Sequence, residues 1–411
     1  MKEIKKENIY LIIVSLIIIF NERVFYLLDS TNKIHWLVIY SLTFLLFIYF
    51  SGEMVKHKFK FSKTILVMNC IIIINFFRTY YVFGQPLDLS LSTYKYTFIL
   101  LLYFPLCIIF AKVNLLKLKT LIILISTIAS LIYFIQKMVY PNFIFLNVFF
   151  SERFGEVRFF NGISLITLGF FITLSLLFEK KSLKNRVILS SSIVLQLSFI
   201  IFVAQSRNII LPLVFILLLV LIKEMISNDV KKIFLNGSII LILIISVFPY
   251  FKEMTDSILN DIGRDSGSAY IRVLSQEYFL DKIKQNLFLG YGLFSDSYAY
   301  GSFLKGTYYK YFAEDVGLIG LTFQFGVIYS LIYILVFLKI ILGAFNNKFN
   351  KKEKMWVIYF SVFTLLYSPF SVLLNVDNSL LIFILFISLY DSITSKKRLE
   401  IEENDKRGIK C

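Results

Sequence analysis

The sequence predicts an all-α polytopic membrane protein on three grounds: its composition, the recurrence of long apolar stretches, and the charge between them. Hydrophobic residues make up 58% of the 411 residues, they include 45 Phe, and the mean hydropathy is +0.76. So much apolar surface cannot be buried in one aqueous core. Stretches that approach the roughly 20 residues needed to cross a bilayer recur along the whole chain.

The charge between these stretches predicts their orientation. Lys and Arg alternate in density from one gap to the next, and the N-terminus with every second gap carries the whole net charge of +16. The positive-inside rule assigns that side to the cytoplasm. We therefore expect about twelve transmembrane helices, with both ends of the chain inside and a near-neutral outer face. Because the basic balance is explained by orientation, it does not indicate a nucleic-acid partner.

The whole chain, 1–411, is predicted to form a single integral membrane domain that ends in a cytoplasmic tail at 392–411. The N-terminal MKEIKKEN precedes an apolar run with no small-residue cleavage site, which favours a retained signal anchor. The last two spans, joined by Leu373–Asn378, form either two full crossings or a re-entrant hairpin. The expected spans are 9–28, 34–50, 64–83, 97–111, 118–140, 159–178, 187–204, 208–226, 233–250, 315–343, 355–374 and 376–391.

One outer link, residues 251–314 between spans nine and ten, is far longer than the others. Loops of this length in a compact protein are usually functional or disordered, and this one is too rich in Tyr and Phe for a disordered linker. Within it, Ser268–Asn286 is predicted to be an amphipathic helix on the outer membrane surface, followed by a stop at Gly290-Tyr291-Gly292. We therefore expect a helical extracytoplasmic subdomain. The predicted apolar face of its helix consists of Ile271, Leu274, Tyr278 and Ile283.

Arginines of the outer face are the clearest candidates for a site, because an Arg held at the membrane boundary is costly and tends to have a partner or a task. Arg207 lies in a tight turn, Ala204–Asn208, that leaves little room to reach bulk water. Arg153 lies beside Glu152 and Glu156, so a simple ion pair explains it. The remaining candidates are Arg158 at the start of span six, and Arg264 and Arg272 in the long loop.

Metal and disulfide chemistry find little support in the sequence. Of the three cysteines, Cys70 and Cys107 lie in apolar spans and Cys411 is the last residue. The only histidines are His35 and His57, and His57 lies in a cytoplasmic link. The outer face therefore offers too few ligands for a conventional zinc site, and we expect neither a metal nor a cofactor.

Three segments of the chain stand out by their motifs and by their expected position on the outer side. The first is Arg158-Phe159-Phe160-Asn161-Gly162 at the start of a span. The second is the turn Gln205-Ser206-Arg207. The third runs from Arg272 through Asn286-Leu287-Phe288-Leu289-Gly290-Tyr291-Gly292 and is followed by Glu314-Asp315-Val316-Gly317-Leu318-Ile319-Gly320. Together these segments resemble the O-antigen and capsule polymerase (Wzy) family, within the wider O-antigen ligase-like superfamily. The resemblance covers roughly 150–330, and the first four spans match only as hydrophobic helices.

One departure separates two branches of that superfamily. Its ligases usually carry a histidine in the long loop, shortly before the span that opens with a Gly-Ile-Ile-Gly-like motif. This chain has no histidine there, which favours a polymerase over a ligase.

The resemblance implies glycosyl transfer between two undecaprenyl-diphosphate-linked oligosaccharides on the outer face of a bacterial cytoplasmic membrane. Membrane lipid, a chain-length regulator and a flippase are the further partners that it implies. Guanidinium groups suit a lipid diphosphate without a metal, and Arg158, Arg207, Arg264 and Arg272 are the candidates. Glu314 or Asp315 would act with Arg272 in catalysis as the acceptor of the hydroxyl proton, with Glu277 and Asp296 behind them. The candidates to position sugars are Tyr291, Tyr308 and Tyr309.

A flippase or another secondary transporter of lipid-linked oligosaccharides is the alternative from a different class. Twelve spans in about 400 residues suit a transporter as well. However, two-half transporters have a long central cytoplasmic link after span six, whereas residues 179–186 form a short one here. No internal repeat is evident either. The acids and arginines gather outside rather than within spans, which favours an enzyme.

Overall fold

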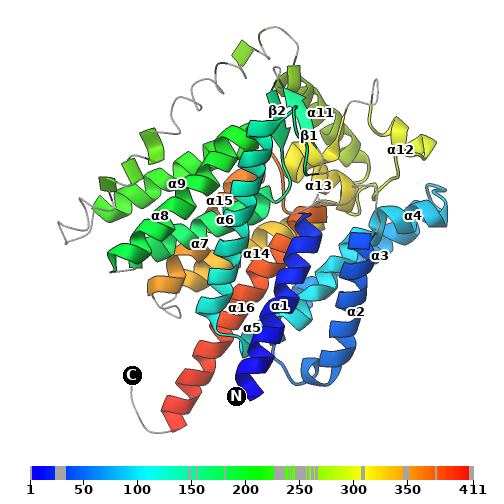
Figure 1. Cartoon of the computed structure of the whole chain (residues 1–411). Helices are drawn as coiled ribbons and strands as arrows, with labels where there is room; N and C mark the ends of the chain where they lie inside the picture. The colour runs from blue at the N-terminus through cyan, green and yellow to red at the C-terminus, as the bar shows by residue number, and fades with distance from the viewer. Residues whose placement is uncertain are drawn as a thin grey trace.

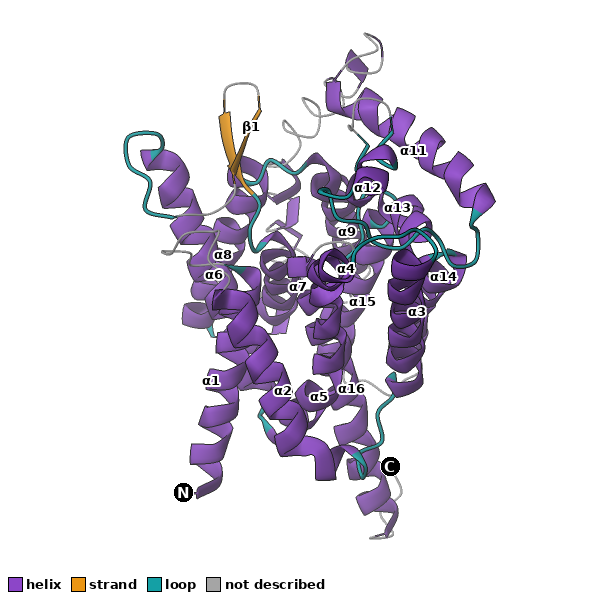
Figure 2. Cartoon of the chain, turned by 90° about the vertical axis from the view of Figure 1, so that its right-hand side faces the viewer, coloured by secondary structure: helices purple, strands orange, loops and turns teal. Residues whose placement is uncertain are grey.

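The structure is a computed structural model, and it is a bundle of α-helices with a small β-hairpin at one end (Figure 1). The hairpin, α11 and α12 lie at this end, which we call the loop end. The beginning of α1 and the last turns of α16 lie at the opposite end, which we call the terminus end (Figures 1 and 2). The described residues are 2–23, 34–146, 150–153, 156–179, 182–225, 237–238, 240–241, 243–245, 256, 259–260, 263, 267–306, 311–345, 351–374 and 377–406.

The first half of the chain leads from α1 to the hairpin and the helix that follows it. Its elements are α1 (Lys2–Glu22), α2 (Ile34–Met54), α3 (Ser62–Tyr81), α4 (Leu87–Tyr94), the 3₁₀ helix η1 (Lys95–Leu102), α5 (Tyr103–Lys112), α6 (Leu115–Val139), β1 (Phe150–Arg153), β2 (Glu156–Phe159) and α7 (Ile163–Glu179).

The second half carries the loop-end helices and closes the bundle. Its elements are α8 (Leu183–Ser198), the π-helical turn η2 (Phe199–Val203), α9 (Arg207–Met225), α11 (Gly267–Gln285), α12 (Ala299–Phe303), the 3₁₀ turn η4 (Ala313–Val316), α13 (Gly317–Phe325), α14 (Val327–Phe345), α15 (Lys351–Tyr367) and α16 (Asp377–Lys406).

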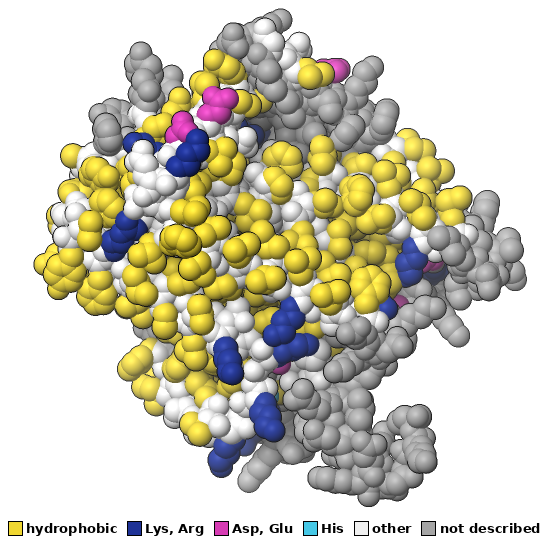
Figure 3. All heavy atoms as spheres, turned by 180° about the vertical axis from the view of Figure 1, so that it is seen from behind, with side chains coloured by type: hydrophobic (Ala, Val, Ile, Leu, Met, Phe, Trp, Pro, Cys, Tyr) yellow, Lys and Arg dark blue, Asp and Glu magenta, His cyan; other side chains and the backbone are white. Residues whose placement is uncertain are grey.

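The chain is a mostly helical, multi-pass membrane protein. Among the described residues, 7 helices are long and apolar enough to cross a bilayer, and Ile163–Glu179 and Ser379–Ser395 are shorter apolar helices. Large apolar side chains such as Leu37, Phe44 and Leu342 are 64% to 68% exposed, as expected of surface that faces lipid. Figure 3 shows hydrophobic side chains over most of the middle of the molecule. The total of twelve spans and their in–out orientation stay predictions.

The predicted tenth span is wrong as a single helix. Residues 315–343 are divided between η4, α13 and α14, and only Val327–Phe345 meets the length of a crossing. The break is at Gly326, whose φ of 84° suits glycine, and a Cβ there would lie 1.9 Å from the carbonyl oxygen of Phe288.

Two other predicted spans differ in their bounds. The fourth apolar stretch is longer than 97–111 and reaches from Leu87 to Lys112. The sixth begins at Ile163, because β2 occupies 156–159.

The centre of the bundle is built around α16. Every residue from Leu380 to Ile393 is buried, and α16 packs against α5, η1, α7 and α1. Aromatic side chains fill this core, and the ring centroid of Phe386 lies 4.7 Å from Phe360 and 5.9 Å from Trp356. The helix continues to Lys406, so the first part of the predicted tail is helical. Of the predicted span nine, 233–250, the structure describes 237–238, 240–241 and 243–245, and each of these residues is helical.

Candidate functional site

The β-hairpin presents Arg158 at the loop end. Val157 and Phe159 are 7% and 1% exposed, and the Phe159 ring packs 6.1 Å from that of Tyr133 in α6. Side chains alternate along a strand, so Arg158 projects to the face opposite those two. Its guanidinium carbon lies 4.9 Å from the ring centroid of Phe160.

Arg272 of α11 is the second arginine of the site, and the structure brings it close to Arg158. Burial, and then the positive charge of Arg272, lower the pKa of Arg158 from its ordinary value. Arginine nevertheless keeps its proton in proteins at any ordinary pH. Two guanidinium groups from distant parts of the sequence therefore share one region, and their mutual repulsion favours an anion between or beside them.

Asp315 and Tyr367 complete this cluster, which we call the arginine cluster: Arg158, Arg272, Asp315 and Tyr367. Tyr367, the last residue of α15, lies within electrostatic reach of both Arg272 and Asp315. The four members come from β2, α11, η4 and α15. A carboxylate, two cations and a phenol are thus gathered by tertiary structure alone.

Contact with the end of α15 holds η4 in place beside the cluster. The N–H of Leu318 donates to the carbonyl oxygen of Ser368 at 2.9 Å. Gly317 has a φ of 53°, and a Cβ there would lie 2.1 Å from that same oxygen. Only glycine allows this approach, which explains the Gly at the start of α13.

Glu314 precedes Asp315 in the chain but lies in different surroundings. It lines a cavity of about 260 Å³ together with Lys305, Asp296 and several aromatic rings. The amide Nε2 of Gln324 donates to its carboxylate at 3.2 Å, and Lys305 forms an ion pair with Asp296 at 2.6 Å. Desolvation by the surrounding protein atoms, followed by the charge of Asp315, raises the pKa of Glu314, although its side chain keeps access to solvent. The two candidate proton acceptors thus have different partners, and Asp315 is the one that shares Tyr367 with Arg272.

The Gly290-Tyr291-Gly292 segment docks α11 onto the break between α13 and α14. The N–H groups of Tyr291 and Gly292 donate to the carbonyl oxygens of Phe323 and Gln324, each at 2.7 Å. Tyr291 is 4% exposed, and its ring stacks on Phe83 and Phe323. Its hydroxyl donates to Gln285 at 3.0 Å. The role of Tyr291 in sugar binding stays a prediction, and this placement points instead to packing.

Arg78, in the last turn of α3, is a residue that the sequence did not single out. Its guanidinium donates to the carbonyl oxygen of Gly290 and to the side-chain oxygen of Asn286, and its carbon lies 5.2 Å from the ring centroid of Phe83. An Arg in the last turn of an apolar helix is the signal that would have identified it. It fixes the loop segment to α3 rather than entering the arginine cluster.

Helix α11 confirms the predicted helix to within one residue at each end, since it spans Gly267–Gln285 rather than Ser268–Asn286. Its buried stripe is Ser275, Phe279 and Ile283, which face α13. The predicted face was therefore displaced by one residue, except at Ile283. Contact of this helix with a membrane surface stays a prediction.

For most of the other predicted site residues, the structure describes only the backbone or nothing. Arg207 is the first residue of α9, directly after the turn in which Gln205 has a φ of 47°, and β2 contacts the preceding η2. The π-helical turn shortly before Arg207 thus contacts the strand that carries Arg158. Glu277 is exposed on α11. The side chain of Arg207 and the residues Arg264, Tyr308 and Tyr309 lie outside what the structure describes.

Within the described ranges, no three His, Cys, Asp or Glu side chains are placed to hold one metal ion. Independence from a metal stays a prediction of the sequence.

A comparison of the chain with known protein families identifies one similar family. Residues 192–334 match the O-antigen ligase family, Wzy_C. The match supports the O-antigen ligase-like superfamily, whose members assemble polysaccharides from lipid-linked sugars, without separating polymerases from ligases. A search of curated proteins finds no match to the chain.

The matched Wzy_C segment begins within α8 and ends within the first half of α14. It therefore contains Arg207, Arg272, Glu314 and Asp315, whereas Arg158 and Tyr367 lie outside it. The arginine cluster thus joins residues of the matched segment to residues before and after it in the chain.

Proposed function

We propose that this protein is a polysaccharide repeat-unit polymerase of the Wzy type. It transfers an oligosaccharide from a lipid diphosphate to a hydroxyl of a second lipid-linked repeat unit, at the outer face of a bacterial cytoplasmic membrane. The observation that carries the proposal is the arginine cluster at the loop end, where two guanidinium groups lie near a carboxylate and a phenol. The Wzy_C match supports the same class of reaction.

The two arginines suit the leaving group of this reaction. As the bond between C1 of the donor sugar and the phosphate oxygen breaks, the lipid diphosphate takes the electron pair and gains negative charge. Guanidinium groups offer several N–H donors to phosphate oxygens in a fixed geometry. Donors that are held in a water-poor site contribute about 3–4 kcal/mol each to the stability of a transition state. Arg158 and Arg272 are the described candidates, and Arg207 and Arg264 are proposed to join them.

Asp315 suits the other half of the reaction. The acceptor hydroxyl oxygen bonds to C1 of the donor sugar, and its proton passes to a carboxylate as the new bond forms. Asp315 is the better candidate for this base because it lies near Tyr367 and, through it, Arg272. Glu314 faces a separate aromatic-walled cavity, so its proposed role is contact with a sugar rather than proton transfer.

A ligase is the second candidate, because the matched family is described as O-antigen ligase. A ligase would use the same donor but a different acceptor, a glycolipid rather than another lipid-linked repeat unit. The lack of a loop histidine favours the polymerase.

One reconstitution separates the candidates. The purified protein in liposomes receives a lipid-diphosphate-linked oligosaccharide, with and without an acceptor glycolipid, and no nucleotide sugar. A ladder of longer lipid-linked products that forms without the glycolipid is the result that the proposal expects. Transfer only to the glycolipid would identify a ligase. Unchanged substrate on the opposite side of the bilayer would identify a transporter and overturn the proposal.

A further inference from the structure

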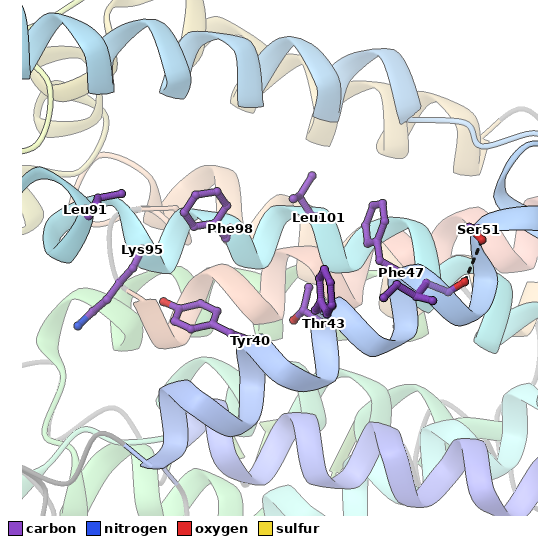
Figure 4. Close-up of a pocket in the computed structure, with 10 residues that line it drawn as sticks. Tyr40, Thr43, Phe47, Ser51, Leu91, Lys95, Phe98 and Leu101 are labelled. Carbon is purple, nitrogen blue, oxygen red and sulfur yellow. Dashed lines mark hydrogen bonds between the residues drawn. The ribbon is translucent and has the colours of Figure 1, made fainter. Parts of the chain in front are cut away.

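A second feature of the molecule, separate from the arginine cluster, is a long apolar groove between α2 and the α4–η1 segment. Its volume is about 800 Å³. Phe44 and Phe47 of α2 and Phe98 and Leu101 of η1 form its walls. Figure 4 shows that Tyr40 and Lys95 lie at one end and Ser51 at the other. Phe44 and Phe98 are 67% and 51% exposed, so the groove is open at the side of the bundle.

The end of the groove near Lys95 is cationic and aromatic. The Lys95 amino nitrogen lies 5.5 Å from the ring centroid of Trp36, and the guanidinium carbon of Arg23 lies 5.7 Å from the same ring. The Trp36 ring stacks on Tyr40 at 5.5 Å. Arg23 follows α1, which begins at the terminus end (Figure 1), so this is the loop end of the groove. Trp, Tyr and Lys in such an arrangement are typical of the headgroup level of a membrane.

The length of the groove and the charge at its end indicate what kind of molecule it can bind. Tyr40 and Ser51 are about 17 Å apart along the axis of α2, at ~1.5 Å per residue, which is more than half of a bilayer core about 30 Å thick. Below the cations the walls are almost wholly apolar, with Thr43 and Ser51 as minor exceptions. The groove therefore suits a lipid with an extended hydrocarbon chain and an anionic headgroup beside Lys95.

The backbone that lines the groove is unusual. Lys95–Leu102 is a 3₁₀ helix of 8 residues, whereas runs beyond three or four residues are uncommon and often mark a functional hinge. The residue before it, Tyr94, accepts a hydrogen bond from the N–H of Leu293 at 2.8 Å. Leu293 directly follows Gly292, which pairs with Gln324 of α13. Lys95 directly follows Tyr94 in the chain. A headgroup bound at Lys95 would thus lie next to the Tyr94–Leu293 hydrogen bond, which helps to hold the Gly290–Gly292 segment.

We propose that this groove binds a polyisoprenyl diphosphate lipid, with its chain along α2 and η1 and its phosphate at Lys95. The choice of a polyisoprenyl lipid rests on the proposed function, because polymerisation needs two lipid-linked substrates. The arginine cluster binds the diphosphate that leaves, and the groove holds the lipid of the other substrate, whose diphosphate remains intact.

Photo-crosslinking tests this site without any need for turnover. The photoreactive residue p-benzoylphenylalanine is placed at Phe44 in the groove and, as a matched control, at Phe77, an exposed Phe of α3 that does not line the groove. The full-length protein in phosphatidylcholine vesicles receives polyisoprenyl diphosphate, and adducts are identified by mass. The groove position is expected to give the polyisoprenyl adduct and the control position little or none.

Lys95 variants and a competing lipid complete the test. Lys95→Gln is expected to reduce the adduct about fivefold, the effect of one Lys near an anionic headgroup, while Lys95→Arg retains it. Excess phosphatidylglycerol should not displace the lipid. Equal labelling at both positions, displacement by phosphatidylglycerol, or no effect of Lys95→Gln would each overturn the proposal.

The outcome is distinguishable from failure of the proposed function. An adduct without a product ladder in the wild-type protein would support the groove and reject the polymerase. A ladder without an adduct would support the polymerase and reject the groove.

Discussion

Arg158 of β2 and Arg272 of α11 lie close enough that the charge of Arg272 contributes to lowering the pKa of Arg158. A folded protein that brings two cations together accepts a cost, because like charges repel and each loses hydration on burial. Attraction to an anion with several oxygens, bound between or beside the two guanidinium groups, would offset this repulsion. This relationship suggests that the site is built for a ligand rather than for stability.

The first prediction follows from that cost. Arg272→Gln removes one of the two like charges, so the melting temperature of the ligand-free protein should stay the same or rise. Thermal unfolding in detergent measures this, with Lys284→Gln on the same helix as the control, because Lys284 is 76% exposed and lies away from the cluster. A clear loss of stability in Arg272→Gln would indicate a structural arginine instead.

The second prediction separates the two neighbouring acids. Asp315→Asn should lower the rate of polymerisation by about 10²–10⁴, the usual contribution of a general base. Glu314→Gln should leave the catalytic step largely intact and instead raise the substrate concentration needed for half-maximal rate. Product ladders timed over a range of substrate concentrations measure both effects. Equal loss of rate in both variants would contradict the division of roles.

The third prediction concerns pH. Desolvation by crowding protein atoms and the charge of Asp315 raise the pKa of Glu314 above its ordinary value of 4.5, although the side chain keeps access to solvent. An acid with a higher pKa in the folded state binds its proton more tightly when folded, so this contribution favours folding at low pH. It is lost as the pH rises from 4.5 through the folded-state pKa.

Glu314→Gln should remove this loss, so the variant gains stability relative to the wild type as the pH rises. Melting temperatures between about pH 4 and about pH 8 measure the difference. Glu277→Gln, an exposed acid on α11, is the control. A constant difference across that range would show that Glu314 titrates alike in both states.

The fourth prediction concerns the docking of the loop segment. Gly292 has a φ of +90°, and a Cβ there would lie 2.4 Å from Thr79 Cγ2 and 2.6 Å from the Tyr94 hydroxyl. Gly292→Ala should therefore destabilise the protein by about 1–3 kcal/mol. Gly52→Ala in α2 is the control, because nothing lies within 4 Å of a Cβ there, and it should be neutral or stabilising by up to about 1 kcal/mol. Chemical denaturation compares the two, and equal stability would contradict the packing described.

The fifth prediction concerns Arg78. Its hydrogen bonds to Gly290 and Asn286 join α3 to the loop end. Arg78→Met should lose about 1.5–3 kcal/mol, the usual contribution of a hydrogen bond to a charged group, and should expose the segment after α11 to proteases. Limited proteolysis followed by mass spectrometry measures this exposure. An unchanged cleavage pattern would show that the loop is held by other contacts.

The sequence predicts the helical, membrane-spanning character well because apolar length is a local property. The α11 helix was also predictable to one residue, since its start and stop signals are local. The split of residues 315–343 was not predictable by hydropathy, because α13 and α14 together form a nearly continuous apolar run. Gly326 was the visible sign, and its meaning depends on the approach of Phe288, which is distant in sequence.

For the candidate site too, local sequence predicted the residues but not the tertiary contacts between them. Residue type and expected sidedness identified Arg158, Arg272 and Asp315, but nothing local indicated that the structure would bring these three together. Tyr367 was missed because a Tyr at the end of an apolar helix is common at membrane interfaces. Its relation to Arg272 and Asp315 arises from packing of α15 against the start of α13.

The most direct test of the account is the rate at which Arg272→Gln extends a lipid-diphosphate-linked oligosaccharide in liposomes, beside the wild type and Lys284→Gln. We predict a ladder of products for the wild type and the control, and a rate about 10²–10³ lower for Arg272→Gln. A normal ladder from well-folded Arg272→Gln protein would contradict the role of the arginine cluster in polymerisation.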